Sequence, residues 1–327
     1  MRGRGWTGIA AVAGAACAGA GAAPGEATRI DTLPTSSAAS VAGAPTAASS
    51  APVPVAAPVA SVAQDRAPRP CPDGMVHVAR DYCPRLERRC VRAVETRDRR
   101  HICTEYERAS RCVGAREPLS YCIDRYEYPN RVGAHPVGVA NWYDAASTCA
   151  SVGKRLCWEA EWTAACEGPE ELPFPTGVTR DASACNIDLP PQMVLLDRML
   201  ARDPEVRQRE LARVDRSDAS GRRATCDSAH GVADLTGNFD EWVNAESVGG
   251  PGAWAALKGG SWIRSRNSCR AVMSGHAPSF RFHTLGFRCC ADAVGSATRR
   301  ASGGARPPPV PRGAPNRHAW PGGVIVP

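Results

Sequence analysis

The sequence predicts a loop-rich domain of short helices and short strands that is held together by disulfides. Fourteen of the fifteen cysteines lie between Cys71 and Cys290, and an even number in a bounded segment favours disulfides in an oxidising compartment. Amphipathic helical spacing is confined to a few short segments. Much of the remaining chain carries short strand patterns separated by glycine-containing loops, as at Gly259-Gly260-Ser261-Trp262.

Composition divides the 327 residues into four parts. The first fits an export signal, the second is an Ala/Pro/Ser/Val tract with almost no aromatic residues, and the last is rich in Pro, Gly and Arg. Neither the tract nor the tail can bury a core, so we expect both to be disordered. The signal, the linker, one folded domain and the tail are predicted at residues 1–23, 24–70, 71–292 and 293–327.

The N-terminal segment predicts export from the cytoplasm. Arg2 and Arg4 precede a run of small apolar residues, and small-residue cleavage options lie around Ala18–Ala23. Cys17 leaves open a lipoprotein, acylated at that cysteine after processing, although the residues before it lack the bulky apolar side chain that such a site prefers. We expect a periplasmic or cell-surface protein whose membrane contact, if it has one, is a lipid anchor at Cys17.

The charge pattern excludes one class of partner. The net charge of +7 comes almost wholly from arginine, because Lys154 and Lys258 are the only lysines. Acidic residues are interspersed among the arginines, which argues against a nucleic-acid partner. No nucleotide cofactor is expected either.

Three segments have helical spacing. The segment Asn141–Val152 is an amphipathic helix with Asn141 as its N-cap, and Trp158–Cys166 is a second short helix. The arginine-rich pattern Asp197–Asp215 is broken by Pro204, and we expect a surface insertion there. Inward-facing positions of the first two helices are Trp142, Ala145, Ala146, Cys149, Trp162, Ala165 and Cys166.

Six segments, in this order along the chain, carry a family resemblance. They are Gly74–Val76, Cys122–Tyr128, Asn141–Ala146 with Gly153–Leu156 and Glu159–Trp162, Asp234–Trp242, Lys258–Trp262, and Gly286–Arg288. Together they resemble the sulfatase-modifying factor family, whose best-known member is the formylglycine-generating enzyme. The resemblance implies the family's C-type-lectin-like α+β fold over residues 71–292, with Gly74–Val76 and Cys122–Tyr128 as its first two strands.

The resemblance also implies two disulfides, Cys149–Cys289 and Cys166–Cys269. An insertion at residues 82–120 separates the first two strands. We expect the cysteines around it to pair mostly among themselves, in a pattern that stays open, and the other four to form the remainder. The first group is Cys71, Cys83, Cys90, Cys103, Cys112 and Cys122, and the second is Cys157, Cys185, Cys226 and Cys290.

Calcium is the cofactor that the resemblance implies. In the resembling enzymes the Gly-Asn turn wraps a calcium ion, which here corresponds to the Asp234 and Glu241 side chains and the Gly237 and Phe239 carbonyls. Such an all-oxygen set suits Ca²⁺. Asn186-Ile187 resembles half of a second site. The alternative is that Asp234 and Glu241 only cap the turn through hydrogen bonds.

The copper centre of the formylglycine-generating enzyme is missing from this sequence. That enzyme uses a pair of cysteines suited to copper(I), and the first of the pair corresponds to Arg264. Bare counting places the second at Cys269, whereas counting back from Gly286 makes Cys269 the family's structural cysteine and leaves a partner for Cys166. We prefer the second alignment, and on either one the pair is absent, so no copper is expected.

Two further departures agree with the loss of formylglycine chemistry. A family tryptophan is replaced by Asp240 and a family arginine by Val272. The His-x3-His-x-Glu iron ligands of the related sulfoxide synthases do not occur among the seven histidines. We therefore do not expect formylglycine synthesis by the known mechanism.

The candidate pocket residues come from the family's catalytic region. His276 and His283 are spaced to reach a metal together with Asp240, although loop histidines are often only polar caps. Nearby arginines can recognise a carboxylate or an anionic glycan, or can simply form a solvated basic rim. The pocket candidates are Ser261, Arg264, Asp240, His276 and His283, and the arginines are Arg264, Arg266, Arg270 and Arg281.

From these features we predict an exported, calcium-binding recognition module for an extracytoplasmic protein or an anionic glycan. The alternative is an oxidoreductase of the same family that uses a centre other than copper-thiolate. Since the redox cysteine pair is absent, the sequence leaves open whether the chain is an enzyme.

Overall fold

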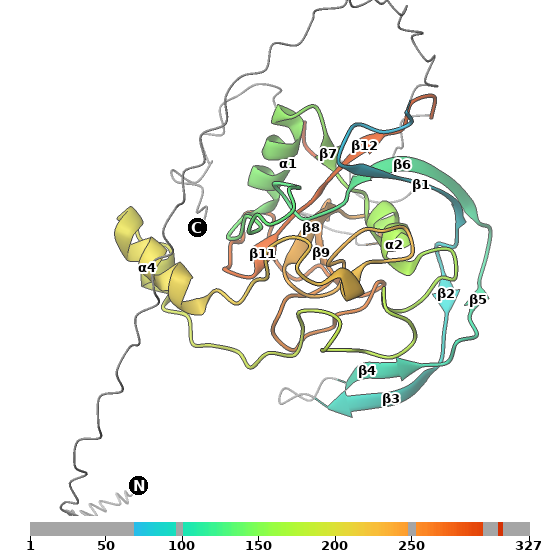
Figure 1. Cartoon of the computed structure of the whole chain (residues 1–327), viewed down its shortest axis with the longest axis horizontal. Coiled ribbons are helices and arrows are strands. Elements are labelled where there is room, and N and C mark those ends of the chain that lie inside the picture. The colour runs from blue at the N-terminus through green and yellow to red at the C-terminus, as the bar shows by residue number, and fades with distance from the viewer. Residues whose placement is uncertain (1–68, 96–100, 248–252, 297–306, 310–327) are drawn as a thin grey trace, which may run out of the picture. The chain divides into compact units, whose positions relative to one another are not determined.

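A computed structural model describes residues 69–95, 101–247, 253–296 and 307–309. The predicted signal with Cys17, almost all of the linker and most of the tail therefore lie outside the described residues. Figure 1 labels most of the elements of the domain. They are β1 (Met75–Tyr82), β2 (Leu86–Glu87), β3 (Cys90–Glu95), β4 (His101–Tyr106), β5 (Arg111–Cys112), β6 (Glu117–Asp124), α1 (Trp142–Ser151), β7 (Arg155–Leu156), α2 (Glu159–Glu167), α3 (Leu196–Met199), α4 (Pro204–Val214), a 3₁₀ turn (Ala224–Cys226), β8 (Asp240–Asn244), β9 (Ala255–Lys258), β10 (Val272–Met273), β11 (Leu285–Gly286) and β12 (Cys289–Asp292).

The first sheet has the strand order β1-β6-β12-β7. Its second strand starts five residues earlier than the predicted Cys122 and ends at Asp124, four residues before the predicted end. The reason is the antiparallel ladder with β1, which runs unbroken from Met75 opposite Asp124 to Tyr82 opposite Glu117. The insertion is correspondingly shorter, and occupies residues 83–116 between the two strands.

The second sheet has the order β10-β9-β8-β11 and lies between α1 and α2 (Figure 1). Neighbouring residues of a strand point to opposite faces, and residues directly opposite across a ladder share a face. Trp242 and Leu257 therefore pack in the cluster that contains α1, whereas Val243 and Ala256 pack in the cluster that contains α2. This sheet thus has two buried faces, each covered by one helix.

The helices begin where local chemistry favours them. The Asn141 side chain accepts from the Asp144 amide, and the Asp144 carboxylate accepts from the Asn141 amide, which closes a capping box at the start of α1. Pro204 opens α4 behind an Asp203 cap instead of lying within a helix. Besides its surface positions, α4 buries Leu211 in a small cluster with Met199 of α3.

Seven disulfides staple the described domain. Cys149 is bonded to Cys289 and Cys166 to Cys269, the two pairs that the resemblance implies. The other bridges are Cys71–Cys122, Cys83–Cys112, Cys90–Cys103, Cys157–Cys290 and Cys185–Cys226. So many bridges indicate an oxidising environment outside the cytoplasm. In the described part of the chain, no helix is long and apolar enough to cross a membrane.

Candidate functional site

The predicted catalytic region is closed. Asp240 borders a cavity of only about 10 Å³, between Leu257 and the loop that carries Arg266. The Asp240 carboxyl is 7% exposed and accepts one hydrogen bond, from the Gly260 amide at 3.3 Å. Burial raises its pKa from 3.8 to about 7. A ligand the size of a side chain has no room beside this group.

The structure does not gather the other predicted pocket residues around Asp240. The Ser261 carbonyl accepts from Asn267, and exposed Arg264 pairs with Asp188 at 3.3 Å. His276 stacks on Phe280, with 4.1 Å between ring centroids. His283 is buried against Trp262 and Phe282. Within the described residues, no group of three or more His, Cys, Asp or Glu side chains is arranged to hold a metal ion.

Glu241, a predicted calcium ligand, is saturated by hydrogen bonds. Arg288 donates to both carboxylate oxygens, from Nη2 to Oε1 at 2.7 Å and from Nε at 2.8 Å to Oε2 and 3.0 Å to Oε1. Trp162 Nε1 donates to Oε2 at 2.9 Å. These contacts take the four lone-pair directions of the carboxylate. Glu241 therefore has none left for calcium, and the cation beside it is the buried guanidinium of Arg288.

Two segments that carry predicted calcium donors lie side by side, at Gly237 and at Asn186. The Asn186 carbonyl accepts from the Asn238 amide, and Gly237 approaches Asn186 so closely that an added Cβ would lie 2.4 Å from that carbonyl. Asp234 is 3% exposed, and burial raises its pKa to about 7. No hydrogen bond from another described residue reaches its carboxylate. The Asp234 side of the site thus fits a cation, whereas the Glu241 side does not.

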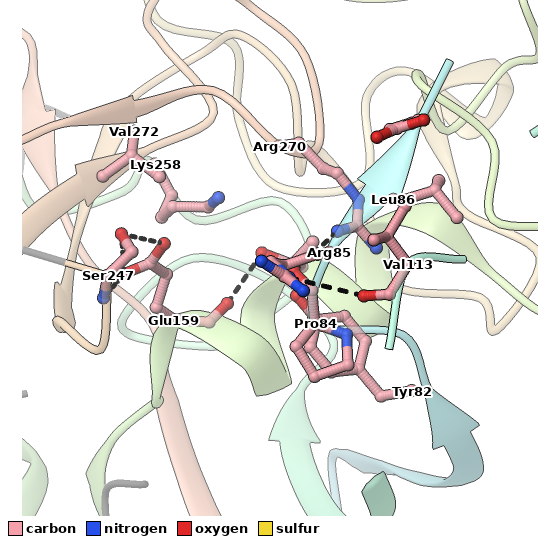
Figure 2. Close-up of a pocket in the computed structure, with 12 residues that line it drawn as sticks. Tyr82, Pro84, Arg85, Leu86, Val113, Glu159, Ser247, Lys258, Arg270 and Val272 are labelled. Carbon is pink, nitrogen blue, oxygen red and sulfur yellow. Dashed lines mark hydrogen bonds between the residues drawn. The ribbon is translucent and has the colours of Figure 1, made fainter. Parts of the chain in front are cut away.

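An open cavity lies on the other face of the second sheet, around Lys258. Its volume is about 460 Å³, within the range of small-molecule sites. Figure 2 shows the Lys258 side chain pointing into the space between Glu159 and Ser247 on one side and Arg270 and Leu86 on the other. The lining residues are Tyr82, Pro84, Arg85, Leu86, Glu87, Val113, Glu159, Thr163, Ser247, Lys258, Arg270 and Val272.

Lys258 is a buried cation without an anionic partner. It is 1% exposed, and its Nζ lies 5.4 Å from the centre of the Trp162 ring. No hydrogen bond or ion pair within the described segments engages that nitrogen. Burial lowers the pKa of Lys258 from 10.5 to about 8, against the opposing effect of Glu159. Such a group is costly to bury unless something pairs with it.

Two other charged groups of the cavity, Glu159 and Arg270, are already engaged. Glu159 accepts from the Ser247 hydroxyl at 2.7 Å and from the Ser247 amide at 3.1 Å. Arg270 pairs with Glu167, its Nη2 donates to the Cys83 carbonyl at 2.8 Å, and its guanidinium lies 5.3 Å from the centre of the Tyr82 ring. Unlike Glu159 and Arg270, Lys258 would meet a bound ligand with no pairing from another described residue.

The cysteine-rich insertion forms one wall of this cavity. Residues 84–87 directly follow Cys83 and Val113 directly follows Cys112, so the Cys83–Cys112 bridge joins the two segments of this wall. In Figure 1 the insertion, drawn in cyan, lies on the same side of the second sheet as α2. The sequence did not predict this site, although Lys258 belongs to Lys258–Trp262, one of the segments that carry the family resemblance. The available signal was that Lys258 is one of only two lysines.

Comparisons with known proteins agree with the fold. The model of the family described as "Sulfatase-modifying factor enzyme 1-like domain" matches residues 104–293. The formylglycine-generating enzyme of Streptomyces coelicolor is 31% identical over 49% of this chain and 53% of its own length. That of Bos taurus is 29% identical over 48% and 44%. Serine/threonine-protein kinase pkn1 of Chlamydia caviae is 27% identical over 47% and 24%.

The chain spans about half or less of the length of these curated relatives. Among solved structures, that titled CarF has a TM-score of 0.45 at 15% identity and covers 67% of this chain and 97% of its own. PvdO from Pseudomonas aeruginosa has a TM-score of 0.37 at 16% identity and covers 67% and 94%. The match to the family model carries the assignment of the α+β, C-type-lectin-like fold.

Proposed function

The chain belongs to the sulfatase-modifying factor family, and from that premise we propose that it is a recognition module that binds an acidic group of a protein or a glycan. The observation that carries the proposal is Lys258, a buried cation that faces an open cavity of about 460 Å³ without an anionic partner. A carboxylate or sulfate that enters the cavity would supply the missing counter-charge. Charge-assisted hydrogen bonds of this kind are among the strong ones.

The state of the cysteines supports recognition over thiol chemistry. All fourteen cysteines of the domain are bridged, and the bridged pair closest in sequence, Cys90–Cys103, is 13 residues apart. Arg264, at the position of the family's first copper cysteine, is an exposed side chain paired with Asp188. No arrangement in the described segments favours the alternative of an oxidoreductase with a different centre.

Binding of acidic probes to matched variants tests the proposal. Calorimetry with acetate, sulfate, a hexuronic-acid oligosaccharide and an Asp/Glu-rich peptide distinguishes the glycan from the protein partner. We expect Lys258→Gln to weaken binding roughly ten- to a hundredfold, because it removes one charge-assisted hydrogen bond. Arg264→Gln is the matched control on the other side of the sheet. If Arg264→Gln weakens binding and Lys258→Gln does not, the site is misplaced.

The affinity should also depend on pH in a definite direction. Burial lowers the pKa of Lys258 to about 8, so the ammonium that meets the anion is lost as the pH rises through that value. Binding is therefore expected to weaken above about pH 8 and to be level below it. A level profile up to pH 10 would show that another cation binds the ligand.

Calcium and export are separate parts of the proposal. We place calcium at Asp234 and the nearby carbonyls of Gly237 and Phe239, supported by the absence of a hydrogen bond to the Asp234 carboxylate from other described residues. Because an ion that binds only the folded state stabilises it, EGTA should lower the melting temperature, and an unchanged temperature would remove calcium. For export to the periplasm or the cell surface, with or without a lipid on Cys17, mass analysis of the mature N-terminus is the test.

A further inference from the structure

The two lysines of the chain differ in the state of their amines. Lys154 Nζ donates to Asp124 Oδ1 at 2.6 Å. Lys258 has no such pair within the described segments, and it is 1% exposed. The described structure thus has one paired lysine and one unpaired lysine, and the second faces the cavity of about 460 Å³.

The groups packed around Lys258 leave part of its population unprotonated. Burial and Arg270 lower the pKa of Lys258, to about 8, whereas Glu159, Glu167 and Asp240 act in the opposite direction. The lowered pKa makes the neutral amine more accessible near neutral pH than it is for an ordinary lysine. Desolvation and a neighbouring cation are the conditions under which lysines become nucleophiles toward carbonyl groups.

The same cavity holds the other groups that such chemistry needs. Arg85 lines it, and in the described structure its guanidinium makes only one long hydrogen bond, from Nε to the Val113 carbonyl at 3.4 Å. Its remaining donors suit a carboxylate. Glu159, on the opposite wall, is held in place by the Ser247 hydroxyl.

We propose that Lys258 forms a reversible imine with the carbonyl group of a small 2-oxo acid whose carboxylate binds Arg85. This inference rests on the proposed recognition of an acidic group and narrows its ligand. The Lys258 nitrogen attacks the carbonyl carbon and gives a carbinolamine, and loss of water then leaves a C=N bond. Both protons of the neutral amine depart with the carbonyl oxygen as water, and the proton moves between the two atoms through solvent in the open cavity. No oxidant or reductant takes part.

Borohydride trapping on the full chain tests the inference. The protein is incubated with glyoxylate at neutral pH, reduced with cyanoborohydride and mapped by mass spectrometry. We expect a carboxymethyl group on Lys258 and little or none on Lys154, which serves as the internal control. Lys258→Arg should abolish the adduct, and Arg85→Gln should lower its yield at limiting glyoxylate. Acetate, which has a carboxylate but no reactive carbonyl, should compete without being trapped.

The outcomes separate this inference from the function on which it rests. Equal labelling of Lys154 and Lys258, or no labelling of Lys258, overturns the imine. If acetate or sulfate still binds in that case, recognition of acidic groups stands. If Lys258 is labelled selectively while acetate and sulfate fail to bind, the imine stands and the simpler recognition proposal falls.

Discussion

Asp240 and Lys258 lie on opposite faces of the same two strands, and both are buried ionisable groups without a charged partner among the described residues. On the α1 face, a loop closes over Asp240 and leaves about 10 Å³. On the α2 face, the insertion walls a cavity of about 460 Å³ around Lys258. The family's catalytic region is therefore the closed face here, and the open site lies where an insertion adds to the fold.

Removal of Arg288 tests which cation neutralises Glu241. The contrast assumes that Glu241, directly opposite Lys258 across the ladder, is neutralised by Arg288 and not by Lys258. Arg288→Met leaves a buried carboxylate unpaired, and we expect a loss of about 3–5 kcal/mol in the free energy of unfolding, measured by urea titration. A loss below about 1 kcal/mol would show that Lys258 takes over as the partner of Glu241.

Removal of the Cys83–Cys112 bridge tests whether the insertion forms the wall of the Lys258 cavity. Cys83→Ser with Cys112→Ser opens a loop of 29 residues, for which the chain-entropy model gives roughly 3–4 kcal/mol. Binding of acetate or sulfate at Lys258 should fall as well, because residues on both sides of this bridge line the cavity. Cys90→Ser with Cys103→Ser, in the outer hairpin, is the control. If anion binding is retained without the Cys83–Cys112 bridge but lost without the Cys90–Cys103 bridge, the insertion near Cys83 does not form the wall of the binding site.

The two faces should also respond oppositely to pH. Burial raises the pKa of Asp240 from 3.8 to about 7. The contribution of its neutral carboxyl to the free energy of unfolding is therefore fully present below pH 3.8 and is lost as the pH rises through about 7. Burial lowers the pKa of Lys258 from 10.5 to about 8. The buried ammonium therefore reduces the free energy of unfolding fully below pH 8, and this penalty shrinks as the pH rises toward 10.5. Melting temperatures across this range measure both effects.

Isosteric variants isolate each face. Asp240→Asn should raise the melting temperature by several degrees near pH 8 and change it little near pH 4. Lys258→Met should raise it below pH 8, with a gain that shrinks as the solution becomes more alkaline. Parallel profiles for the two variants would mean that the buried groups do not differ in the way the structure implies.

The contrast between local and long-range information explains what the sequence could predict. The helix at Asn141–Val152 follows from a cap and a spacing within twelve residues, and the structure places α1 there. The bridges Cys149–Cys289 and Cys166–Cys269 came from the family resemblance. The Lys258 cavity forms where segments near residues 85, 159 and 258 come together. No local sequence pattern encodes this long-range contact.

The closed face escaped prediction for a related reason. Family alignment identified Asp240 and Arg264 as neighbours of a pocket, but it could not show that the loop carrying Arg266 leaves almost no space beside Asp240. Nor could it show that the Glu241 carboxylate accepts its hydrogen bonds from Arg288 and Trp162. Ligand sets transfer by position, whereas cavity volume and hydrogen-bond saturation depend on every side chain in contact.

The smallest expected effect is at Arg264, the residue that replaces the family's first copper cysteine. Its side chain is 59% exposed and pairs with Asp188 at 3.3 Å, while Asp188 keeps a second partner in Arg180. Arg264→Gln should therefore change the free energy of unfolding by less than about 1 kcal/mol and leave anion binding unchanged, as measured by urea titration and calorimetry. A large loss of binding would place the ligand on the Asp240 face, and the assignment of the open and closed faces would have to be reversed.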